Sequence, residues 1–300
     1  CCISLMCTML LIAALRAVCR RPTSLRVASL LLVVAASAFA TRRPLKRTVK
    51  RAYTGLVKRA SLPLGYDSAE HAGVGWLETL LNKHHNELLL EAVRADEQGQ
   101  IGPFGFNSPA LKRFAPSGDR WRVRRCKVLG TVSPSCHLVF PELHRLVHKE
   151  PRIRSAGIFI IEGGGETKMH RGYLSTVVRC SYTLHLAPDC RQHGMGIGIH
   201  MINATHDFAP ETPERFQSRR FRFAEGEAIV FNDNFFHRVE NNCSGSRIIV
   251  YTDVTTPTLP WYLQALDLGL TALLQVGINP FYFLNSEALP SVMNNSNKNF

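Results

Sequence analysis

A series of short β-rich segments separated by turns occupies residues 153–257 and limits the folds open to this chain. Ala156–Ile161 is a continuous apolar run that stops at three glycines, and Gly194–Asn203 alternates large apolar residues with small or polar ones. The other candidate strands are Leu174–Leu186, which has room for a β-bulge, Phe221–Phe223, Ala228–Phe231 and Ile248–Tyr251, with a turn at Glu225-Gly226. Several short strands of this kind indicate an all-β barrel or sandwich.

Helical patterns flank these strands on both sides. Asp67–Asp96 carries apolar residues at three-to-four spacing, and Phe140–His148 has a proline suited to the first turn of a helix. Trp261–Val276 is expected to be a helix that packs on the body of the protein. We divide the chain into a leader at 1–60, a helical and loop region at 61–120, a β domain at 121–258, and a C-terminal helix and tail at 259–300.

Positive charge is concentrated in the leader. Residues 1–60 contain 12 of the 36 Lys and Arg residues and no Asp or Glu, which leaves 24 basic and 23 acidic residues in the rest of the chain. Because the body is nearly neutral, the net charge of +13 does not indicate a nucleic-acid-binding surface there.

The leader has the composition of a targeting segment. Val27–Ala40 is a short apolar run with a basic flank and an Ala-x-Ala end, which is typical of a secretory signal, and Ile3–Leu15 is an alternative membrane anchor. We therefore expect the protein to enter the secretory pathway and to reside in the lumen or membrane of the ER or Golgi. The alternative is a plastid, because the basic, acid-free stretch Thr41–Arg47 resembles a transit peptide.

The body of the chain has an odd number of cysteines. They are Cys126, Cys136, Cys180, Cys190 and Cys243, and no Cys-x-x-Cys motif supports a zinc ribbon. Cys126 and Cys136 are candidates for a disulfide in an oxidising compartment, and the sequence leaves the pairing open.

Two histidines and an arginine stand near the ends of predicted strands. His170 follows the glycine-rich loop, His237 comes 67 positions later, after the segment Ile229–Phe236, and Arg247 stands ten residues further on. Neighbouring strand ends converge on one mouth of a barrel, so these side chains can meet. Neutral imidazoles are good ligands for Fe(II), and a guanidinium can bind a carboxylate through two hydrogen bonds. The pattern predicts a mononuclear iron site with an anionic oxo-acid beside it.

The third ligand of the usual mononuclear iron site is missing. That ligand is often a carboxylate two residues after the first histidine, where this chain has Gly172, which leaves a coordination position for water. The chain's His-x-Glu motif, His85-Asn86-Glu87, lies in a predicted helix, where residues two apart point in different directions. We expect His85 and Glu87 to lie on a solvated face.

Taken together, the motifs in residues 121–257 resemble the aspartyl/asparaginyl β-hydroxylases. That family has a His-x-Gly motif where its relatives have His-x-Asp, and Gly172 matches this feature. The family's Phe-Asp-Asp-x-x-x-His block resembles Phe231–His237, and its arginine nine residues after the first histidine matches Arg179. Its second arginine, with the hydrophobic strand and Asp-x-x-x-Pro end that follow, matches Arg247–Pro257.

The resemblance implies a fold, a reaction and a role for each site residue. It implies a mainly β protein with a double-stranded β-helix core of the jelly-roll or cupin kind. It also implies a dioxygenase that uses Fe(II), 2-oxoglutarate and O2 to hydroxylate an aspartyl, asparaginyl or similar side chain of a protein or peptide. His170 and His237 would bind the metal, Arg247 would take the distal carboxylate of 2-oxoglutarate, and Arg179 would hold the co-substrate or an acidic substrate group. Asp233 is either an acceptor that orients a ligand imidazole or a turn residue.

Several positions depart from the family pattern. Ser181 stands where the family has a histidine that serves the co-substrate, and His185 could replace it only if a bulge shifts the strand register. Phe159 stands near the position where the family has a serine that contacts the co-substrate. Asn232 stands in place of the first Asp of the family's Asp-Asp pair. We expect Asp253 to make a structural hydrogen bond. Two other functions are alternatives to protein hydroxylation. One is the hydroxylation of a lipid or small molecule on the same fold, and the other is that of a non-catalytic jelly-roll binding module.

Overall fold

A computed structural model describes the central part of the chain. The residues described are 65–104, 120–170, 177–193, 197–202, 218–233 and 235–257, together with 260 and 264. The leader, Gly172 and most of the Trp261–Val276 segment lie outside the described residues, so the expectations for them stay predictions. Residues 65–257 fall within a single compact unit. Among the helices in the described residues, none has both the length and the apolar character needed to cross a membrane.

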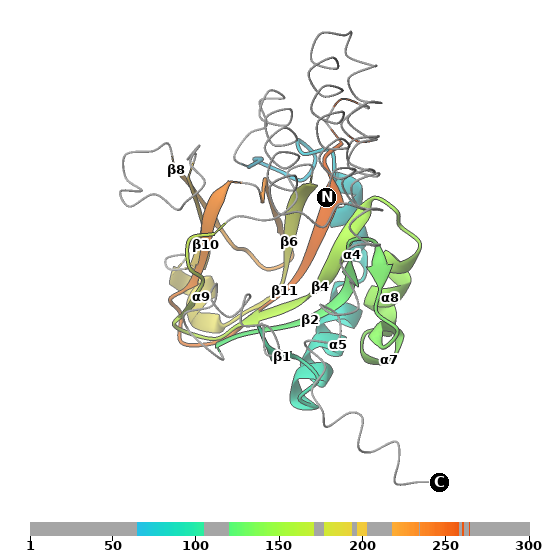
Figure 1. Cartoon of the computed structure of the whole chain (residues 1–300). Coiled ribbons are helices and arrows are strands. Elements are labelled where there is room, and N and C mark those ends of the chain that lie inside the picture. Colours follow the sequence, from blue (N-terminus) through green and yellow to red (C-terminus); the bar gives the residue numbers. More distant parts are fainter. Residues whose placement is uncertain are drawn as a thin grey trace, which may run out of the picture. The chain divides into compact units, whose positions relative to one another are not determined.

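Two antiparallel sheets form the core (Figure 1). Their strands are β1 Gly102–Pro103, β2 Trp121–Val128, β3 Thr131–Val132, β4 Ile153–Ile161, β5 Gly165–Glu166, β6 Val177–Leu186, β7 Ile197–Ile202, β8 Ser218–Arg222, β9 Ala228–Phe231, β10 Phe236–Asn241 and β11 Arg247–Thr255. The larger sheet has the order β1-β2-β4-β11-β6-β9, with β3 beside β2, and the smaller has the order β5-β10-β7-β8. This arrangement confirms the predicted mainly β, double-stranded β-helix core.

Strand β11 shows how the larger sheet is buried on both faces. Ile248 and Val250 belong to the hydrophobic cluster under the helices, whereas Ile249 and Tyr251 belong to a cluster on the opposite, inner face. Successive side chains of a strand point to opposite faces, so a strand covered on both sides is apolar throughout. This explains why the sequence shows a continuous apolar run here, and the strand extends beyond the predicted Ile248–Tyr251 at both ends.

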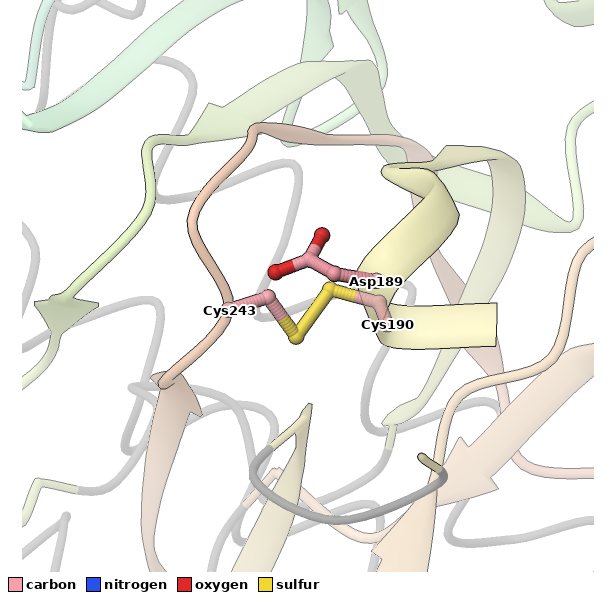
Figure 2. Close-up of side chains that lie close together, drawn as sticks. All are labelled: Asp189, Cys190 and Cys243. Carbon is pink, nitrogen blue, oxygen red and sulfur yellow. A yellow bond between two sulfur atoms is a disulfide. The ribbon is translucent and has the colours of Figure 1, made fainter. Parts of the chain in front are cut away.

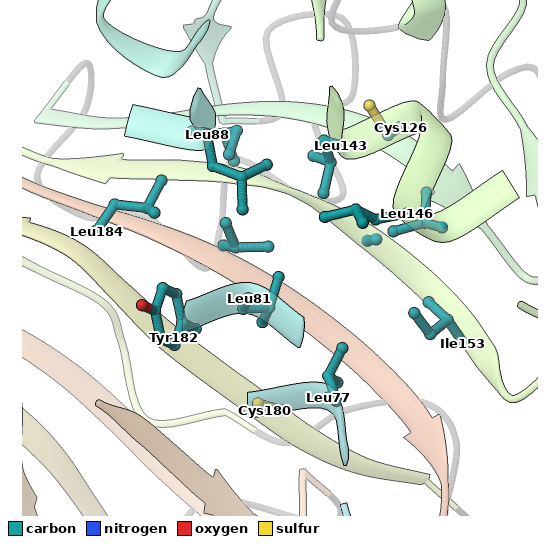
Figure 3. Packing of buried hydrophobic residues seen from close by; sticks show 14 of the residues in the cluster. Leu77, Leu81, Leu88, Cys126, Leu143, Leu146, Ile153, Cys180, Tyr182 and Leu184 are labelled. Atoms are coloured by element: carbon teal, nitrogen blue, oxygen red, sulfur yellow. The ribbon is translucent and has the colours of Figure 1, made fainter. Parts of the chain in front are cut away.

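Helices near the outer face of the larger sheet confirm the helical patterns at Asp67–Asp96 and Phe140–His148, and one further short helix was not predicted. They are α4 Gly75–Lys83, α5 His85–Glu97, α7 Cys136–Val139 and α8 Pro141–His148, with Pro141 in the first turn of α8. The leucines of α4, α5 and α8 belong to one hydrophobic cluster with Tyr182 and Leu184 of β6 (Figure 3). The expectation that His85 lies on a solvated face is wrong, because its Nδ1 lies 2.9 Å from the Tyr182 hydroxyl, whereas Glu87 is exposed.

Two disulfides join the described elements. Cys126 of β2 is bonded to Cys136 at the start of α7, as the sequence suggested, and Cys190 of α9 (Pro188–His193) is bonded to Cys243 between β10 and β11. Cys180 is buried and forms no disulfide. The two bonds fix the α7–α8 hairpin to the larger sheet and the β10–β11 turn to α9.

Loss of either disulfide is expected to lower the free energy of unfolding, with the larger effect at Cys190–Cys243. The bonds close loops with sequence separations of 10 and 53. Chain-entropy loss in the unfolded state corresponds to roughly 3 kcal/mol for the shorter loop and about 4 kcal/mol for the longer one. Denaturant titration of the Cys126→Ala/Cys136→Ala and Cys190→Ala/Cys243→Ala variants measures the difference. Equal losses would contradict the loop-length argument.

Candidate active site

A pocket on the inner face of the larger sheet brings the predicted site residues together. His170, His237, Arg179, Ser181 and Arg247 all line it. The remaining lining residues are largely apolar and comprise Trp121, Phe159, Ile161, Phe223, Phe231, Val239 and Ile249. Polar groups that converge within apolar walls are typical of a small-molecule site.

The two histidines are neighbours across a pair of backbone hydrogen bonds. The His170 N–H donates to the His237 carbonyl at 2.9 Å, and the His237 N–H donates back at 2.7 Å. Their ring centroids are 4.4 Å apart. Two imidazoles bound at adjacent octahedral positions through metal–nitrogen bonds of about 2.1 Å have centroids roughly 4.5 Å apart. The observed spacing therefore fits two imidazoles that share one metal ion.

Backbone carbonyls select the tautomer of both rings. His170 Nδ1 lies 2.7 Å from the Lys168 carbonyl, and His237 Nδ1 lies 2.9 Å from the Phe235 carbonyl. A carbonyl oxygen can only accept a hydrogen bond, so Nδ1 carries the proton in each ring and Nε2 keeps its lone pair. Burial, followed by the nearby His237, lowers the pKa of His170 to about 3, and burial lowers the pKa of His237 to about 4. Both rings are neutral at pH 7, which is the form that binds a metal.

Because these rings stay neutral, acid is expected to destabilise the metal-free protein. An unfolded histidine takes up a proton near its ordinary pKa of 6.5, whereas folded His237 resists protonation until about pH 4. Between those values the unfolded chain binds more protons, so the free energy of unfolding falls as the pH is lowered. Denaturant titrations from pH 7 to pH 4 should show a shallower fall for His237→Gln than for the unsubstituted chain.

Asp233 lies on the side of His237 that faces away from the Phe235 carbonyl. One of its carboxylate oxygens is 3.3 Å from His237 Nε2 and 2.9 Å from the Arg179 guanidinium. The predicted alternative in which Asp233 orients the imidazole is not supported, because the Phe235 carbonyl makes that bond. A carboxylate oxygen and the lone pair on Nε2 repel each other at this distance. A bound cation would relieve that repulsion, so the donors fit a metal ion.

Arg179 is held between two carboxylates. It donates to the two Asp253 oxygens at 2.7 and 3.0 Å, which is the structural hydrogen bond expected of Asp253, and it also pairs with Asp233. Burial alone would lower the pKa of Arg179, but the Asp233 and Asp253 charges outweigh burial and raise it. The guanidinium is a fixed charge at the edge of the pocket.

Arg247 is a buried cation without a counterion among the described residues. The residue is 1% exposed, and its Nε and Nη1 atoms have no hydrogen-bond partner among the described residues. The guanidinium carbon lies 3.8 Å from the centre of the Phe223 ring. Burial lowers the pKa of Arg247 to about 9. An unpaired buried charge is costly, so the residue is poised to receive an anion in the pocket.

Comparison with known proteins places the chain in a family. The family model for aspartyl/asparaginyl β-hydroxylase matches residues 78–257, which is more than half of the chain. The chain belongs to the aspartyl/asparaginyl β-hydroxylase family. It is accordingly an enzyme of the 2-oxoglutarate-dependent oxygenase class. None of the curated proteins matches the chain.

The solved structures to which the chain is similar match it at low identity. A Pseudomonas putida prolyl-4-hydroxylase is 13% identical with a TM-score of 0.36, covering 58% of this chain and 86% of its own. The non-heme α-ketoglutarate-dependent epimerase SnoN from nogalamycin biosynthesis is 12% identical with a TM-score of 0.41, covering 60% of this chain and 77% of its own. A 2OG-Fe(II) oxygenase family protein from Burkholderia pseudomallei is 15% identical with a TM-score of 0.32, covering 46% and 70%.

At the positions where the chain departs from the family pattern, the structure shows which side chains line the pocket. A bulge does interrupt the pairing of β6 with β11, but it leaves His185 near Glu225, at 3.9 Å, and away from the lining of the pocket. Ser181 is buried and lines the pocket. Phe159 also lines it and stacks on Tyr251 with ring centroids 4.1 Å apart. The chain therefore presents an aromatic wall where the family pattern has a serine.

A second group of side chains of the kinds that bind metals has a structural role. Asp189, Cys190 and Cys243 lie within 4.8 Å of one another, but the two sulfurs are bonded to each other (Figure 2). The Asp189 carboxylate accepts the Ser244 N–H at 2.6 Å. Thiols joined in a disulfide do not ligate a metal as thiolates, so this group closes the β10–β11 turn.

Proposed function

We propose that the protein is an Fe(II)- and 2-oxoglutarate-dependent dioxygenase that hydroxylates the β carbon of an aspartyl, asparaginyl or similar side chain in a protein. Family membership supports the reaction class. One observation carries the assignment of the site: two neutral imidazoles with centroids 4.4 Å apart share a pocket with an unpaired buried guanidinium. The first arrangement suits a metal ion, and the second suits a dicarboxylate beside it.

Each site residue then has a defined task. His170 and His237 would hold Fe(II) through Nε2, and Arg247 would donate two hydrogen bonds to the distal carboxylate of 2-oxoglutarate. Bound iron, together with 2-oxoglutarate and O2, supplies the chemistry that oxidises a C–H bond. The apolar lining excludes water from the reacting centre.

Arg179 is the candidate for contact with an acidic group. Two of its N–H groups donate to Asp253, a third nitrogen lies 2.9 Å from an Asp233 oxygen, and the side chain lines the pocket. Because the carboxylates fix the plane of the guanidinium, its charge is presented to the pocket without further ordering of the side chain. A substrate carboxylate or the co-substrate would pair with this charge.

The test is an assay of the full chain with Fe(II), 2-oxoglutarate and peptide pools. The proposal predicts succinate production together with a mass gain of one oxygen atom on peptides that contain Asp or Asn, and none on matched peptides with Ala at those positions. Oxidation of a lipid or small molecule alone would overturn the protein substrate but keep the enzyme class. Absence of 2-oxoglutarate consumption with every substrate would favour the non-catalytic binding module.

We also propose that the protein works in an oxidising compartment of the secretory pathway, anchored or delivered by its leader. The two disulfides among the described residues support this, because structural disulfides are rare in reducing compartments. Protein taken from its own cells after immediate thiol alkylation should show Cys126, Cys136, Cys190 and Cys243 unmodified. Alkylation of all four would contradict the location.

A further inference from the structure

Three histidines gather on the α7–α8 hairpin, which does not contribute to the pocket. His144 is the central one: its ring centroid lies 5.9 Å from that of His137 and 4.8 Å from that of His148. His144 is partly buried, whereas His137 and His148 are exposed. None of the three has a role in the site described above.

The ring of His144 lies close enough to each of the other two to share a metal ion with it. His144 and His148 are four residues apart on one helix, so they project from the same face, as in helical metal-binding motifs. Two imidazoles bound tetrahedrally through bonds of about 2.1 Å have centroids roughly 5 Å apart. The observed 4.8 and 5.9 Å lie on either side of that value. His137 and His148 are exposed, and their rings would have to turn toward a common ion for all three histidines to bind it.

The backbone that carries the three rings is held in place independently of any metal. The Cys126–Cys136 disulfide fixes α7 at the residue before His137. On α8, Leu143 (Figure 3) and Val147 are buried in the hydrophobic cluster under the helices. A rigid frame lowers the entropy cost of binding, because only side-chain rotations remain to be fixed.

The electrostatic surroundings do not oppose a cation. Burial lowers the pKa of His144, and the neighbouring His148 and His137 lower it further, so the central ring is neutral at pH 7. Arg145, the adjacent residue on α8, is paired with Glu142, with its Nε 2.8 Å from a carboxylate oxygen. Its charge is therefore partly neutralised beside the three rings.

We infer that His137, His144 and His148 form a surface site for a divalent transition-metal ion that prefers imidazole ligands, represented by Zn²⁺. Three imidazoles leave one tetrahedral position for water or for a ligand from another molecule. The site is separate from the pocket that contains His170 and His237, and it does not depend on the proposed reaction.

Zinc titration calorimetry on untagged full-length chain tests the inference. A His170→Ala/His237→Ala background removes the pocket histidines, and it should still bind one Zn²⁺ per chain. Adding His144→Gln should weaken that binding by at least about tenfold, and His137→Gln and His148→Gln should each weaken it as well. His71→Gln, which changes an exposed histidine elsewhere, should leave it unchanged.

The same titration can overturn the site. Binding that is unaffected by His144→Gln, or that survives loss of His137 without change, contradicts a three-histidine site. If the background variant does not fold, the otherwise unsubstituted chain and its His144→Gln variant are compared: the expected stoichiometries differ by one Zn²⁺ per chain. Equal stoichiometries would overturn the proposal. Mg²⁺, which prefers oxygen ligands, serves as the negative control.

Discussion

Replacing His170 with alanine is expected to abolish hydroxylation while the barrel stays folded. The substitution removes one of two imidazoles that face each other at 4.4 Å, so a metal held by both would lose half of its protein ligands. We expect turnover to fall by at least about 100-fold, because metal-dependent charge stabilisation supplies several kcal/mol of the barrier reduction. Succinate release and peptide oxidation at fixed Fe(II) measure the loss.

The fold should tolerate the change for a local reason. His170 is partly exposed, and it pairs with His237 through backbone atoms that alanine retains. The circular dichroism spectrum and the denaturation midpoint should therefore be close to those of the unsubstituted chain. His71→Ala is the matched control, since it removes an exposed histidine that does not line the pocket. Full activity of His170→Ala in an assay without excess iron would refute the ligand assignment.

His237→Ala should lose turnover in the same way but with lower stability. Its side chain is fully buried against the Phe231 ring, with centroids 5.1 Å apart, so truncation leaves a cavity as well as a missing ligand. The contrast between the two variants separates metal binding from packing. Equal stability of the two would show that the pocket relaxes around position 237.

Two strands show why part of the fold could not be predicted from the sequence. β2 has four basic residues among its eight, and this polar pattern gave no strand signal. Its strand character comes from pairing with β4 and from partners distant in the chain, such as Asp96 and Glu162 around Arg122. β10 is short and mixed in character, and its pairing with β7 places His237 within a strand rather than after one. Local propensity is weaker than such tertiary pairing.

The candidate site, like the fold, could be predicted from the sequence only in part. Chain order and strand ends were enough to predict that His170, His237 and Arg247 meet. The clamp on Arg179 was not predictable, because it depends on the register that sets Arg179 opposite Asp253 on β11 and opposite Phe231 on β9. A shift of one residue would turn Arg179 to the other face of the sheet. The position of Asp233 beside Nε2 of His237 depends on the ring orientation that the hydrogen bond to the Phe235 carbonyl fixes, which the sequence does not reveal.

Arg247→Met is expected to raise the 2-oxoglutarate concentration needed for half-maximal turnover by about 100-fold, since each charge-assisted hydrogen bond contributes roughly 1.5 to 3 kcal/mol. The same change should leave the ligand-free protein as stable as before or more stable. Arg247 is buried with two unpaired donor nitrogens, and burial lowers its pKa to about 9, so its charge costs stability when no anion is bound. An apolar side chain of similar length removes that cost.

The combination distinguishes a binding residue from a structural one. Steady-state kinetics with varied 2-oxoglutarate give the first effect, and denaturant titration without 2-oxoglutarate gives the second. A structural arginine would show the reverse pattern, with a large loss of stability and little change in the co-substrate requirement. Arg238→Met on β10 is the matched control, because that arginine does not line the pocket. Added 2-oxoglutarate should then stabilise the unsubstituted chain against unfolding more than it stabilises Arg247→Met, because binding to the folded state alone shifts the unfolding equilibrium.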